Sequence, residues 1–214
     1  KELEQFRDRL YEKNMMLTKH QIRDAVNEDN LIIQASDAIE EINRTINILV
    51  KRLREWYSFY LPELENKIRD HEHFVELVVK DKKTLMKDFK IKETMGAGLK
   101  KGDEKQIIEL AKTISVLYNE KGNKEKYLEK IMKKYSPNLT EIAGYSIGAQ
   151  LIALGGSLKN LVMMPASTIQ LLGAEKALFR HMRNKNVKPP KHGIIHEHPL
   201  YKKQRVQRKA RLLV

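Results

Sequence analysis

The 214-residue sequence contains no cysteine. This absence excludes a disulfide framework and any zinc site built on thiolates, and it is typical of proteins that remain inside the cell. The chain also lacks any apolar run near the roughly 20 residues that a membrane-spanning helix needs. Its charged N-terminus does not resemble a signal peptide, so we expect no membrane partner. The sequence begins at Lys1 without a methionine, which is typical of a segment of a longer protein.

Acidic residues are scarce in the last third of the chain. Residues 136–214 hold 13 of the 41 lysines and arginines but only three of the 28 acidic residues, Glu141, Glu175 and Glu197. The charges of residues 1–135 are nearly balanced. The pattern predicts a mixed-charge domain over 1–135 and a cationic module over 136–214. A phosphate-rich partner is the natural inference for the module, with an anionic membrane surface as the competing one.

Residues 1–135 are predicted to be mainly helical, with two apolar seams. The first alternates spacings of three and four for four heptads until Pro62, which is typical of a coiled coil. Its members are Ile32, Ala35, Ile39, Ile42, Ile46, Leu49, Leu53, Trp56 and Tyr60. The second seam comprises Ile107, Ala111, Ile114, Tyr118, Leu128, Met132 and Tyr135. Its intervening positions, Lys121 and Glu125, are charged and lie beside Gly122, so the helix either breaks there or continues with a polar gap.

Two seams joined by a connection predict an antiparallel coiled-coil hairpin. Such a rod has little core of its own, so we expect residues 1–135 to form a homodimer. The predicted dimer seam consists of Ile39, Ile42, Ile46, Leu49 and Leu53. In the connection, short helices are expected from Pro62 and over His71–Met86. The stretch Met95–Gly102 reads as a flexible turn, without the sequence ending or the preceding strand of a phosphate-binding loop.

The cationic module is predicted to be helical and centred on Leu171–Met182. Ser167 and Gln170 have the spacing of a capping box at the start of this helix. On a helical wheel, one face collects the apolar side chains and another collects Gly173 and three cations. The apolar set is Leu171, Leu172, Leu178, Phe179 and Met182, and the cations are Lys176, Arg180 and Arg183.

Gly173 is a poor helix former, by roughly 1 kcal/mol relative to alanine. We therefore expect it to leave bare backbone for close approach of a bulky anion, and a solvated basic face is the alternative. Glu175 falls within the apolar arc. An unpaired carboxylate is costly there, so it is expected to support the structure by bonding a nearby donor, not to act in catalysis.

Elsewhere in the module, a helix is expected to pass through Gly144 and Gly148 and to end at Gly155–Gly156. A short helix over Leu158–Met163 leads through Pro165, and a basic extended loop follows at Lys185–Pro190. The segment Lys202–Arg211 is basic and amphipathic, as in a nucleic-acid arm, a localisation signal or a membrane-surface helix.

Three histidines, His192, His196 and His198, cluster near the end of the module. Their spacing matches no zinc signature, so a metal site is disfavoured. The preferred interpretation is that Gly193–Ile195 is a short extended segment packed on the module. His192 at its edge then stacks on an unpaired base or caps the segment.

Several segments together resemble the Nop domain. In the module they are Met164–Gln170, Leu172–Arg180 and Pro190–Gly193, and in the hairpin Arg52–Tyr57 and Leu61–Leu64 resemble the coiled-coil part of the same proteins. The closest form is the archaeal Nop core protein of box C/D ribonucleoproteins. The similarity extends from about Leu31 onward.

The resemblance implies an all-α fold, in which a long antiparallel coiled-coil hairpin precedes a small helical Nop domain. It implies a scaffold for RNA-guided 2′-O-methylation, with no catalytic residue and no cofactor. The partners would be a box C/D guide RNA with its kink turn, a small kink-turn-binding protein of ribosomal type, and a second copy. Fibrillarin would bind an N-terminal domain that this sequence lacks, and therefore only the full-length protein. The location would be cytoplasmic in an archaeon and nucleolar in a eukaryote.

The expected RNA-binding set combines the basic face with the following loop. It consists of Gly173, Lys176, Arg180, Arg183, Lys188, Lys191 and His192. The connection from Pro199 to Gln207 is shorter than is usual in the family, which predicts a C-terminally truncated Nop domain or omitted residues. Two other hypotheses stay open at this point: a dimeric coiled-coil protein that binds DNA, and a metal hydrolase on the three histidines.

Overall fold

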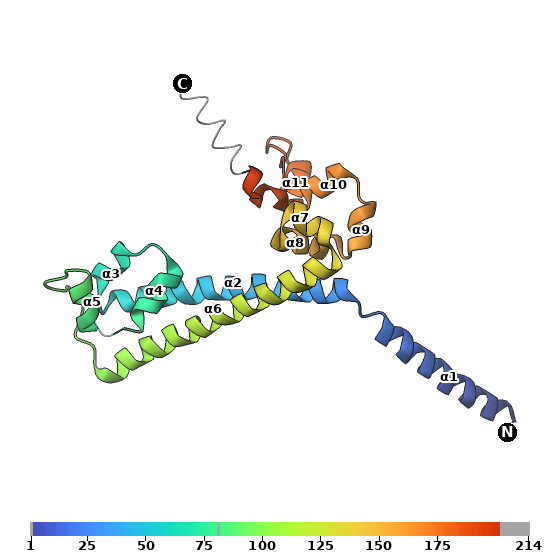
Figure 1. Cartoon of the computed structure of the whole chain (residues 1–214), viewed down its shortest axis with the longest axis horizontal. Coiled ribbons are helices and arrows are strands. Elements are labelled where there is room, and N and C mark those ends of the chain that lie inside the picture. The colour runs from blue at the N-terminus through green and yellow to red at the C-terminus, as the bar shows by residue number, and fades with distance from the viewer. Residues whose placement is uncertain (1, 81, 202–214) are drawn as a thin grey trace. The chain divides into compact units, whose positions relative to one another are not determined.

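The computed structural model describes residues 2–80 and 82–201, and within that part the chain is helical without any strand (Figure 1). The predicted all-α class is confirmed. The long helices are α1 (Glu2–Asp24), α2 (Glu28–Ser58) and α6 (Lys101–Tyr135). The short ones are α3 (Pro62–Lys67), α4 (His71–Val78), α5 (Lys82–Asp88), α7 (Pro137–Ala143), α8 (Tyr145–Gly155), α9 (Leu158–Met163), α10 (Ala166–Leu171), α11 (Glu175–Arg183) and the 3₁₀ helix η1 (Ile194–Glu197). None of the helices described has both the length and the apolar character required to span a bilayer.

The chain divides into two compact units. Unit 1 comprises residues 1–36 and 128–214, and unit 2 comprises residues 37–127. The divisions fall inside α2 and α6, so both long helices contribute to both units. The sequence-based boundary at residue 135 stays an interpretation drawn from charge and composition.

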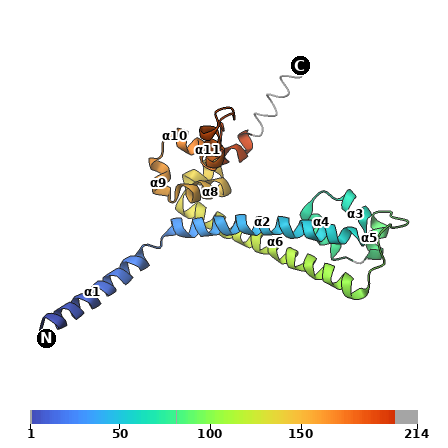
Figure 2. The same ribbon diagram turned by 180° about the vertical axis from the view of Figure 1, so that it is seen from behind.

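Unit 2 is an antiparallel hairpin of α2 and α6, which run side by side in both views (Figures 1 and 2). The direction follows from two hydrogen bonds, one between α2 and α6 and one to α6 from Tyr60, two residues after the end of α2. The Tyr60 hydroxyl donates to Glu104 at 2.5 Å, and Lys121 Nζ donates to Asn43 at 3.1 Å. The hairpin that the two seams predicted is therefore present within one chain.

The first seam shifts by one residue toward the end of α2. Trp56, predicted to lie in the seam, is 36% exposed, whereas the neighbouring Tyr57 is only 2% exposed. An α-helix has 3.6 residues per turn, so a strict seven-residue repeat drifts by about 20° per heptad in a straight helix. After several heptads the next residue faces the partner helix, and Val50 and Tyr57 thus join the core.

The predicted dimer seam lies largely inside this hairpin. Ile46 and Leu53 are 1% and 0% exposed and belong to the core of unit 2. Ile42 and Leu49 are half-buried against the same core, and Ile39 is half-buried. Ile46 and Leu53 therefore have no side-chain surface left for a second copy, because the hairpin itself already covers them.

The second seam belongs to one continuous helix. α6 passes through Gly122 without a break. The polar gap is bridged by Lys121, which bonds Asn43 and lies 3.9 Å from the Glu125 carboxylate. The charged seam positions are thus satisfied by polar partners, and propagation of an established helix tolerates a single glycine.

The closed end of the hairpin carries α3, α4 and α5. The helix predicted over His71–Met86 is split into α4 and α5. An aromatic cluster fills the space, with the Tyr57 ring 5.8 Å from that of Tyr60 and 5.7 Å from that of Phe74, both in edge-on geometry. The Arg54 guanidinium lies 4.3 Å from the centre of the Phe74 ring, and its Nη2 donates to the Ile68 carbonyl at 2.9 Å.

The segment predicted as a flexible turn, Met95–Gly102, is in fact anchored. The Glu63 carboxylate accepts from the Met95 backbone N–H at 2.7 Å and from the Thr94 hydroxyl at 2.9 Å. A side chain at Gly96 would collide with the Tyr60 carbonyl, whose oxygen lies 2.1 Å from the position that a Cβ would occupy. Glycine is therefore needed for close backbone approach and not for mobility.

In unit 1, α7 and α8 replace the single helix expected before Gly155–Gly156. Gly144, with φ +80°, separates them. A Cβ on Gly148 would lie 3.0 Å from the Met132 side chain, so glycine allows close packing there, whereas nothing lies within 4 Å of a Cβ on Gly144. Gly156 ends α8 in the left-handed region with φ +78°, and α9 has the predicted bounds.

Candidate nucleic-acid interface

The predicted central helix of the module is two helices, α10 and α11. α10 is preceded by Pro165, which is its N-cap residue, and Ser167 lies inside the helix and makes no capping bond. The capping-box prediction is therefore wrong. Leu172, only 8% exposed, ends α10 and inserts into unit 1 between the two helices.

Gly173 forms the turn between α10 and α11. Its φ is +84°, in the left-handed region that favours glycine. A Cβ there would lie 3.4 Å from Ile194 Cβ and 3.4 Å from Leu154 Cδ1. The helical-wheel argument for a bare anion-binding patch is thus wrong, because Gly173 is not in a helix and a side chain there would point into its own module.

Glu175 supports this turn. One of its carboxylate oxygens accepts the Gly173 backbone N–H at 2.7 Å, and a carboxylate at the first residue of α11 also interacts favourably with the helix dipole. The prediction of a bond to a nearby donor is confirmed. Its predicted place on an apolar helix face is wrong, since the residue is exposed.

The basic face of α11 has the predicted members. Lys176, Arg180 and Arg183 are spaced by four and three residues and all are exposed. None of them forms an ion pair with an acidic residue in the described part of the chain. Arg180 and Arg183 lie in the last turn, where cations also stabilise the helix dipole. Three unpaired cations therefore share one positively charged face.

The loop after α11 is held at both ends. At its start, the Asn184 side chain accepts the Asn186 backbone N–H at 3.1 Å, and the His181 ring contacts the Val187 carbonyl. At its end, Gln170 Nε2 donates to the Lys191 carbonyl at 2.7 Å. The exposed Lys188 and Lys191 are therefore carried on a tethered loop.

Gln170 holds the end of this loop in place and does not form the predicted capping box with Ser167. Its side-chain Nε2 lies 3.2 Å from His192 Nδ1, and its backbone carbonyl accepts the Gly193 N–H at 2.7 Å. Together these contacts fasten the end of the loop to α10. Only the tertiary fold brings position 170 beside position 192.

His192 is half-buried and its ring already has an intramolecular neighbour. The Tyr201 ring centre lies 5.0 Å away with a tilt of 59°. The following segment packs on the module as predicted but is the 3₁₀ helix η1 and not extended. Gly193 is required there, because a Cβ would lie 1.8 Å from the Leu172 carbonyl oxygen.

The histidine cluster does not form a metal-binding arrangement. Among the residues that the structure describes, no group of three or more His, Cys, Asp or Glu side chains converges as metal ligands would. His198 Nδ1 instead accepts the Leu200 backbone N–H at 3.3 Å. The segment Lys202–Arg211 lies outside the described residues.

An apolar stripe borders the basic face of α11. Phe179 and Met182, predicted to pack inward, are 61% and 65% exposed. The break at Gly173 rotates α11 independently of α10, so that Leu178 and His181 form its half-buried side. The surface of α11 thus combines unpaired cations with exposed apolar side chains.

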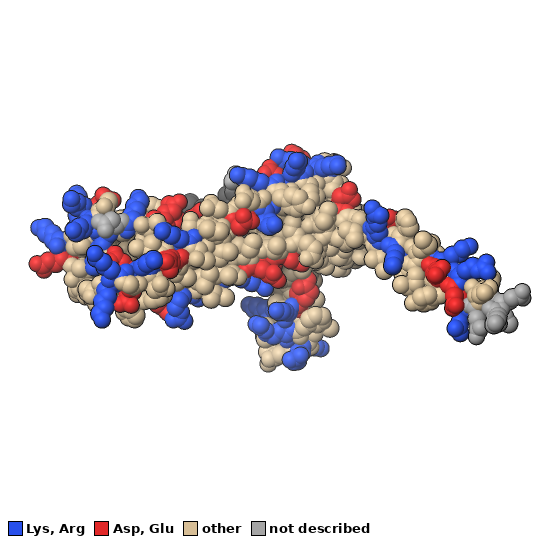
Figure 3. All heavy atoms as spheres, turned by 90° about the horizontal axis from the view of Figure 1, so that it is seen from below, with Lys and Arg blue, Asp and Glu red and all other residues tan. Residues whose placement is uncertain are grey.

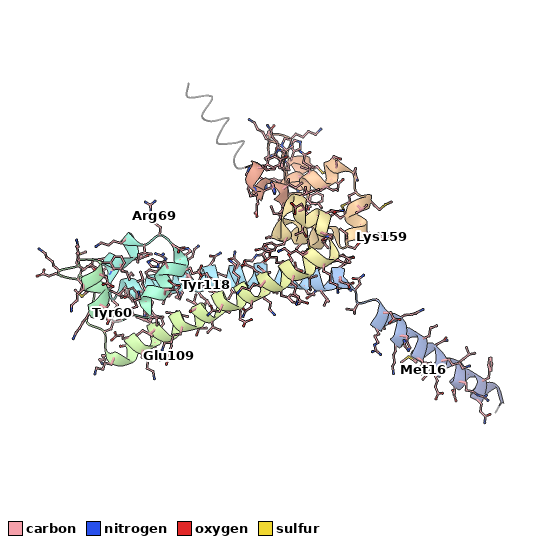
Figure 4. All side chains as sticks on the ribbon, in the orientation of Figure 1. Met16, Tyr60, Arg69, Glu109, Tyr118 and Lys159 are labelled. Atoms are coloured by element: carbon pink, nitrogen blue, oxygen red, sulfur yellow. The ribbon has the colours of Figure 1, made fainter. Side chains whose placement is uncertain are left out.

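A buried carboxylate that the sequence interpretation missed anchors the module. Asp29 is 5% exposed, and its Oδ1 accepts the Leu158 backbone N–H at 3.1 Å. It also accepts a hydrogen bond from Tyr135. Burial, the Asp29 charge and this hydrogen bond raise the pKa of the Tyr135 hydroxyl. Asp29 therefore joins α2, α6 and α9, while Lys159 next to Leu158 projects outward (Figure 4).

Comparison with known proteins places these features in one family. Residues 38–213 match the family model described as "Nop: snoRNA binding domain, fibrillarin". An uncharacterised NOP5 family protein of Methanocaldococcus jannaschii is 43% identical, over 92% of this chain and 52% of its own length. Nucleolar protein 56 of Dictyostelium discoideum is 37% identical over 78% of the chain and 35% of its own length. Nucleolar protein 58 of Schizosaccharomyces pombe is 33% identical over 84% and 39%. The chain thus spans about half or less of the length of these relatives.

Proposed function

Because the chain belongs to the Nop family, we propose that it is a non-catalytic scaffold of a box C/D ribonucleoprotein that guides 2′-O-methylation of RNA. In this proposal the module binds a kink-turn guide RNA together with a small kink-turn-binding protein of ribosomal type. Fibrillarin would join through a part of the full-length protein beyond this sequence. The ribonucleoprotein would be located in the cytoplasm if the source is an archaeon and in the nucleolus if it is a eukaryote, where the relatives are named nucleolar proteins.

The observation that carries the proposal is the exposed basic face of α11. Lys176, Arg180 and Arg183 have no acidic partner among the described residues, and fixed cations without partners attract phosphates. Lys188 and Lys191 extend the same charge onto the tethered loop. Arginine side chains add paired donors that suit phosphates and base edges.

A composite site is supported by the apolar stripe beside the cations. Phe179 and Met182 are largely exposed and lie on α11 next to the basic face. In a composite site the RNA phosphates would contact the cations of α11, and the small protein would cover the neighbouring apolar stripe.

The test is a gel-shift with kink-turn RNA, with and without the small protein. The variant with Lys176→Ala and Arg180→Ala should bind more weakly, and its log–log salt dependence should flatten by roughly 0.7–0.9 units for each lost phosphate contact. A matched control replaces Lys126 and Lys130, two exposed cations of α6, with alanine. An unchanged slope in the first variant would show that these α11 cations contact only solvent.

The same assay separates the DNA-binding alternative. The basic face alone attracts either nucleic acid, whereas contacts to ribose hydroxyls and unstacked bases favour RNA. We expect kink-turn RNA to compete much better than duplex DNA of equal length. Equal competition would favour the DNA-binding alternative.

We also propose that two copies associate through the outer surface of the hairpin. Ile48, Phe59 and Val116 are 68%, 64% and 60% exposed in unit 2, although each is a large apolar side chain. Ile39, Ile42 and Leu49 can contribute only their half-exposed edges. Burial of these side chains against a second copy would remove apolar surface from water and stabilise the dimer by about 25 cal/mol for each Å² buried.

A further inference from the structure

Lysines are concentrated at the closed end of the hairpin, in a part of the chain whose overall charge is nearly balanced. Residues 80–101 contain eight lysines and three acidic residues. Seven of these lysines are exposed, and they are here called the tip lysines: Lys80, Lys83, Lys87, Lys90, Lys92, Lys100 and Lys101. Figure 3 shows lysine and arginine side chains around this end of unit 2, at the left of the view.

The fold turns the tip lysines outward. Leu85 is fully buried and fixes the inner side of α5. Lys83 and Lys87 lie two residues before and after it, which on a helix is the opposite side. They are four residues apart and exposed, so both point toward solvent from one stripe.

The side chains of the tip lysines make no hydrogen bond within the described chain, in contrast to those of two neighbouring lysines. Lys82 Nζ lies 3.9 Å from the centre of the Tyr60 ring and donates to the Tyr60 carbonyl at 2.9 Å. Lys67 Nζ donates to the Phe89 carbonyl at 2.8 Å. The tip lysines make no ion pair with any acidic residue that the structure describes.

Lys90 stands where glycine would fit better. Its φ is +51°, and it is the only non-glycine residue of the described chain with a positive φ. The N–H of Ile91 bonds the Met86 carbonyl at 2.8 Å, and the N–H of Lys90 bonds the Lys87 carbonyl at 3.1 Å. This is the Schellman pattern that ends a helix, and glycine is the usual residue at that position. A strained residue whose side chain does nothing for the fold is evidence for a role outside it.

We propose that the tip lysines form a second RNA contact, which binds the phosphate backbone of a duplex without reading its sequence. Lysine supplies compact charge without the paired donors of arginine, which suits contacts that position RNA and do not specify bases. A membrane surface fits less well, because α5 exposes Lys83, Thr84, Lys87 and Asp88, and Met95 is the only large apolar side chain exposed between residues 82 and 101. The inference rests on the proposed function only in taking the polyanion to be RNA.

The absence of cysteine permits a direct test by site-specific cross-linking. Lys90→Cys creates a single thiol in the full chain, to which a photoreactive benzophenone is attached. The probe is kink-turn RNA whose stem continues into a long plain duplex, and the control is the same label at Lys124→Cys, an exposed position in the middle of α6. We expect a cross-link to the duplex from position 90 and none from position 124.

A second measurement uses charge removal. Lys83, Lys87, Lys90 and Lys92 are changed together to glutamine, and the control changes Lys112, Lys124, Lys126 and Lys130, which are exposed on α6. The tip variant should lose roughly 0.7–0.9 units of salt dependence for each contact on the long duplex, or about three units in total. It should bind a short kink-turn RNA normally. Equal losses in the tip and control variants, or no loss together with no cross-link, would overturn the proposal.

Lys90→Gly separates binding from stability. It removes the side chain and relieves the backbone, so it should raise the melting temperature while weakening binding to the long duplex. A phosphate contact would be refuted if Lys90→Gly were stabilised but bound the duplex fully, and if the fourfold glutamine variant also kept its salt dependence on the long duplex. If the full chain bound polyglutamate or anionic vesicles through the tip lysines, and position 90 did not cross-link to RNA, the proposal would be overturned in favour of another acidic partner.

These outcomes are independent of those for α11. If Lys176→Ala with Arg180→Ala has no effect while the tip variant loses duplex binding, the proposed module site fails and the tip contact stands. If only the α11 variant is impaired, the tip contact fails and the proposed module site stands.

Discussion

Replacement of Gly173 by alanine tests whether the turn between α10 and α11 is a structural element or an RNA-contacting surface. An L-residue in the left-handed region costs roughly 1–2 kcal/mol, and the glycine here has φ +84°. The added Cβ would lie 3.4 Å from Ile194 Cβ and Leu154 Cδ1, so both neighbours need to move only slightly. We therefore expect Gly173→Ala to destabilise unit 1 by about 1–2 kcal/mol, nearly all of it from backbone strain.

The matched control is Gly122→Ala in α6. Apart from the adjoining residues and the backbone of α6 itself, no atom lies within 4 Å of the Cβ that this change adds, and the position is helical. Alanine should therefore stabilise the helix by up to about 1 kcal/mol. The two substitutions add the same methyl group but are expected to shift stability in opposite directions.

The assay combines thermal unfolding followed by circular dichroism with a gel-shift on kink-turn RNA well below the melting temperature. For a protein of this size, 1 kcal/mol corresponds to roughly 2–4 °C in melting temperature. Gly173→Ala should melt lower and bind normally when folded. A variant that melts like the parent and fails to assemble would refute the reasoning, because it would show that a partner presses on this backbone.

Three further predictions concern the rest of the chain. Asp29→Ala should destabilise unit 1 by about 1–3 kcal/mol, because it leaves two half-buried donors, the Leu158 N–H and the Tyr135 hydroxyl, without their charged acceptor. Chemical denaturation checks this, and a loss below about 0.5 kcal/mol, as is usual for surface positions, would contradict it. Burial alone would raise the pKa of Glu63, but hydrogen bonds from Met95 and Thr94 and the charge of Lys82 outweigh it and lower the pKa. The ionised carboxylate therefore stabilises unit 2 at pH values above its unfolded pKa of about 4.5. This contribution to stability is lost as the pH falls through the lower pKa of the folded state. Denaturation from pH 2 to 6 should therefore show a weaker acid dependence in Glu63→Gln than in Glu65→Gln, and identical profiles would count against the shift. Ile48→Lys with Val116→Lys should convert a dimer to a monomer in sedimentation without unfolding the hairpin, and an intact dimer would place the contact elsewhere.

The helical character of the chain and its basic module followed from the sequence, because periodicity and composition are local properties. The alternating apolar spacing from Ile32 to Leu53 requires a helix packed along one side, whatever covers it. The exposure of Lys176 and Arg180 followed in the same way, since unpaired cations remain in water. The Leu158–Met163 helix was predicted from its flanking glycines and proline.

Tertiary structure decided which surfaces those helices leave open. A heptad pattern does not say whether its partner is the same chain or another, and in the fold Ile46 and Leu53 are covered by the hairpin itself. A helical wheel assumes that the helix continues, whereas at Gly173 the backbone turns so that Ile194 can pack beside it. The contacts of Asp29 with Leu158 and of Gln170 with His192 join residues distant in sequence. Such contacts leave no periodic signal, because long-range packing and not local conformational preference brings the partners together.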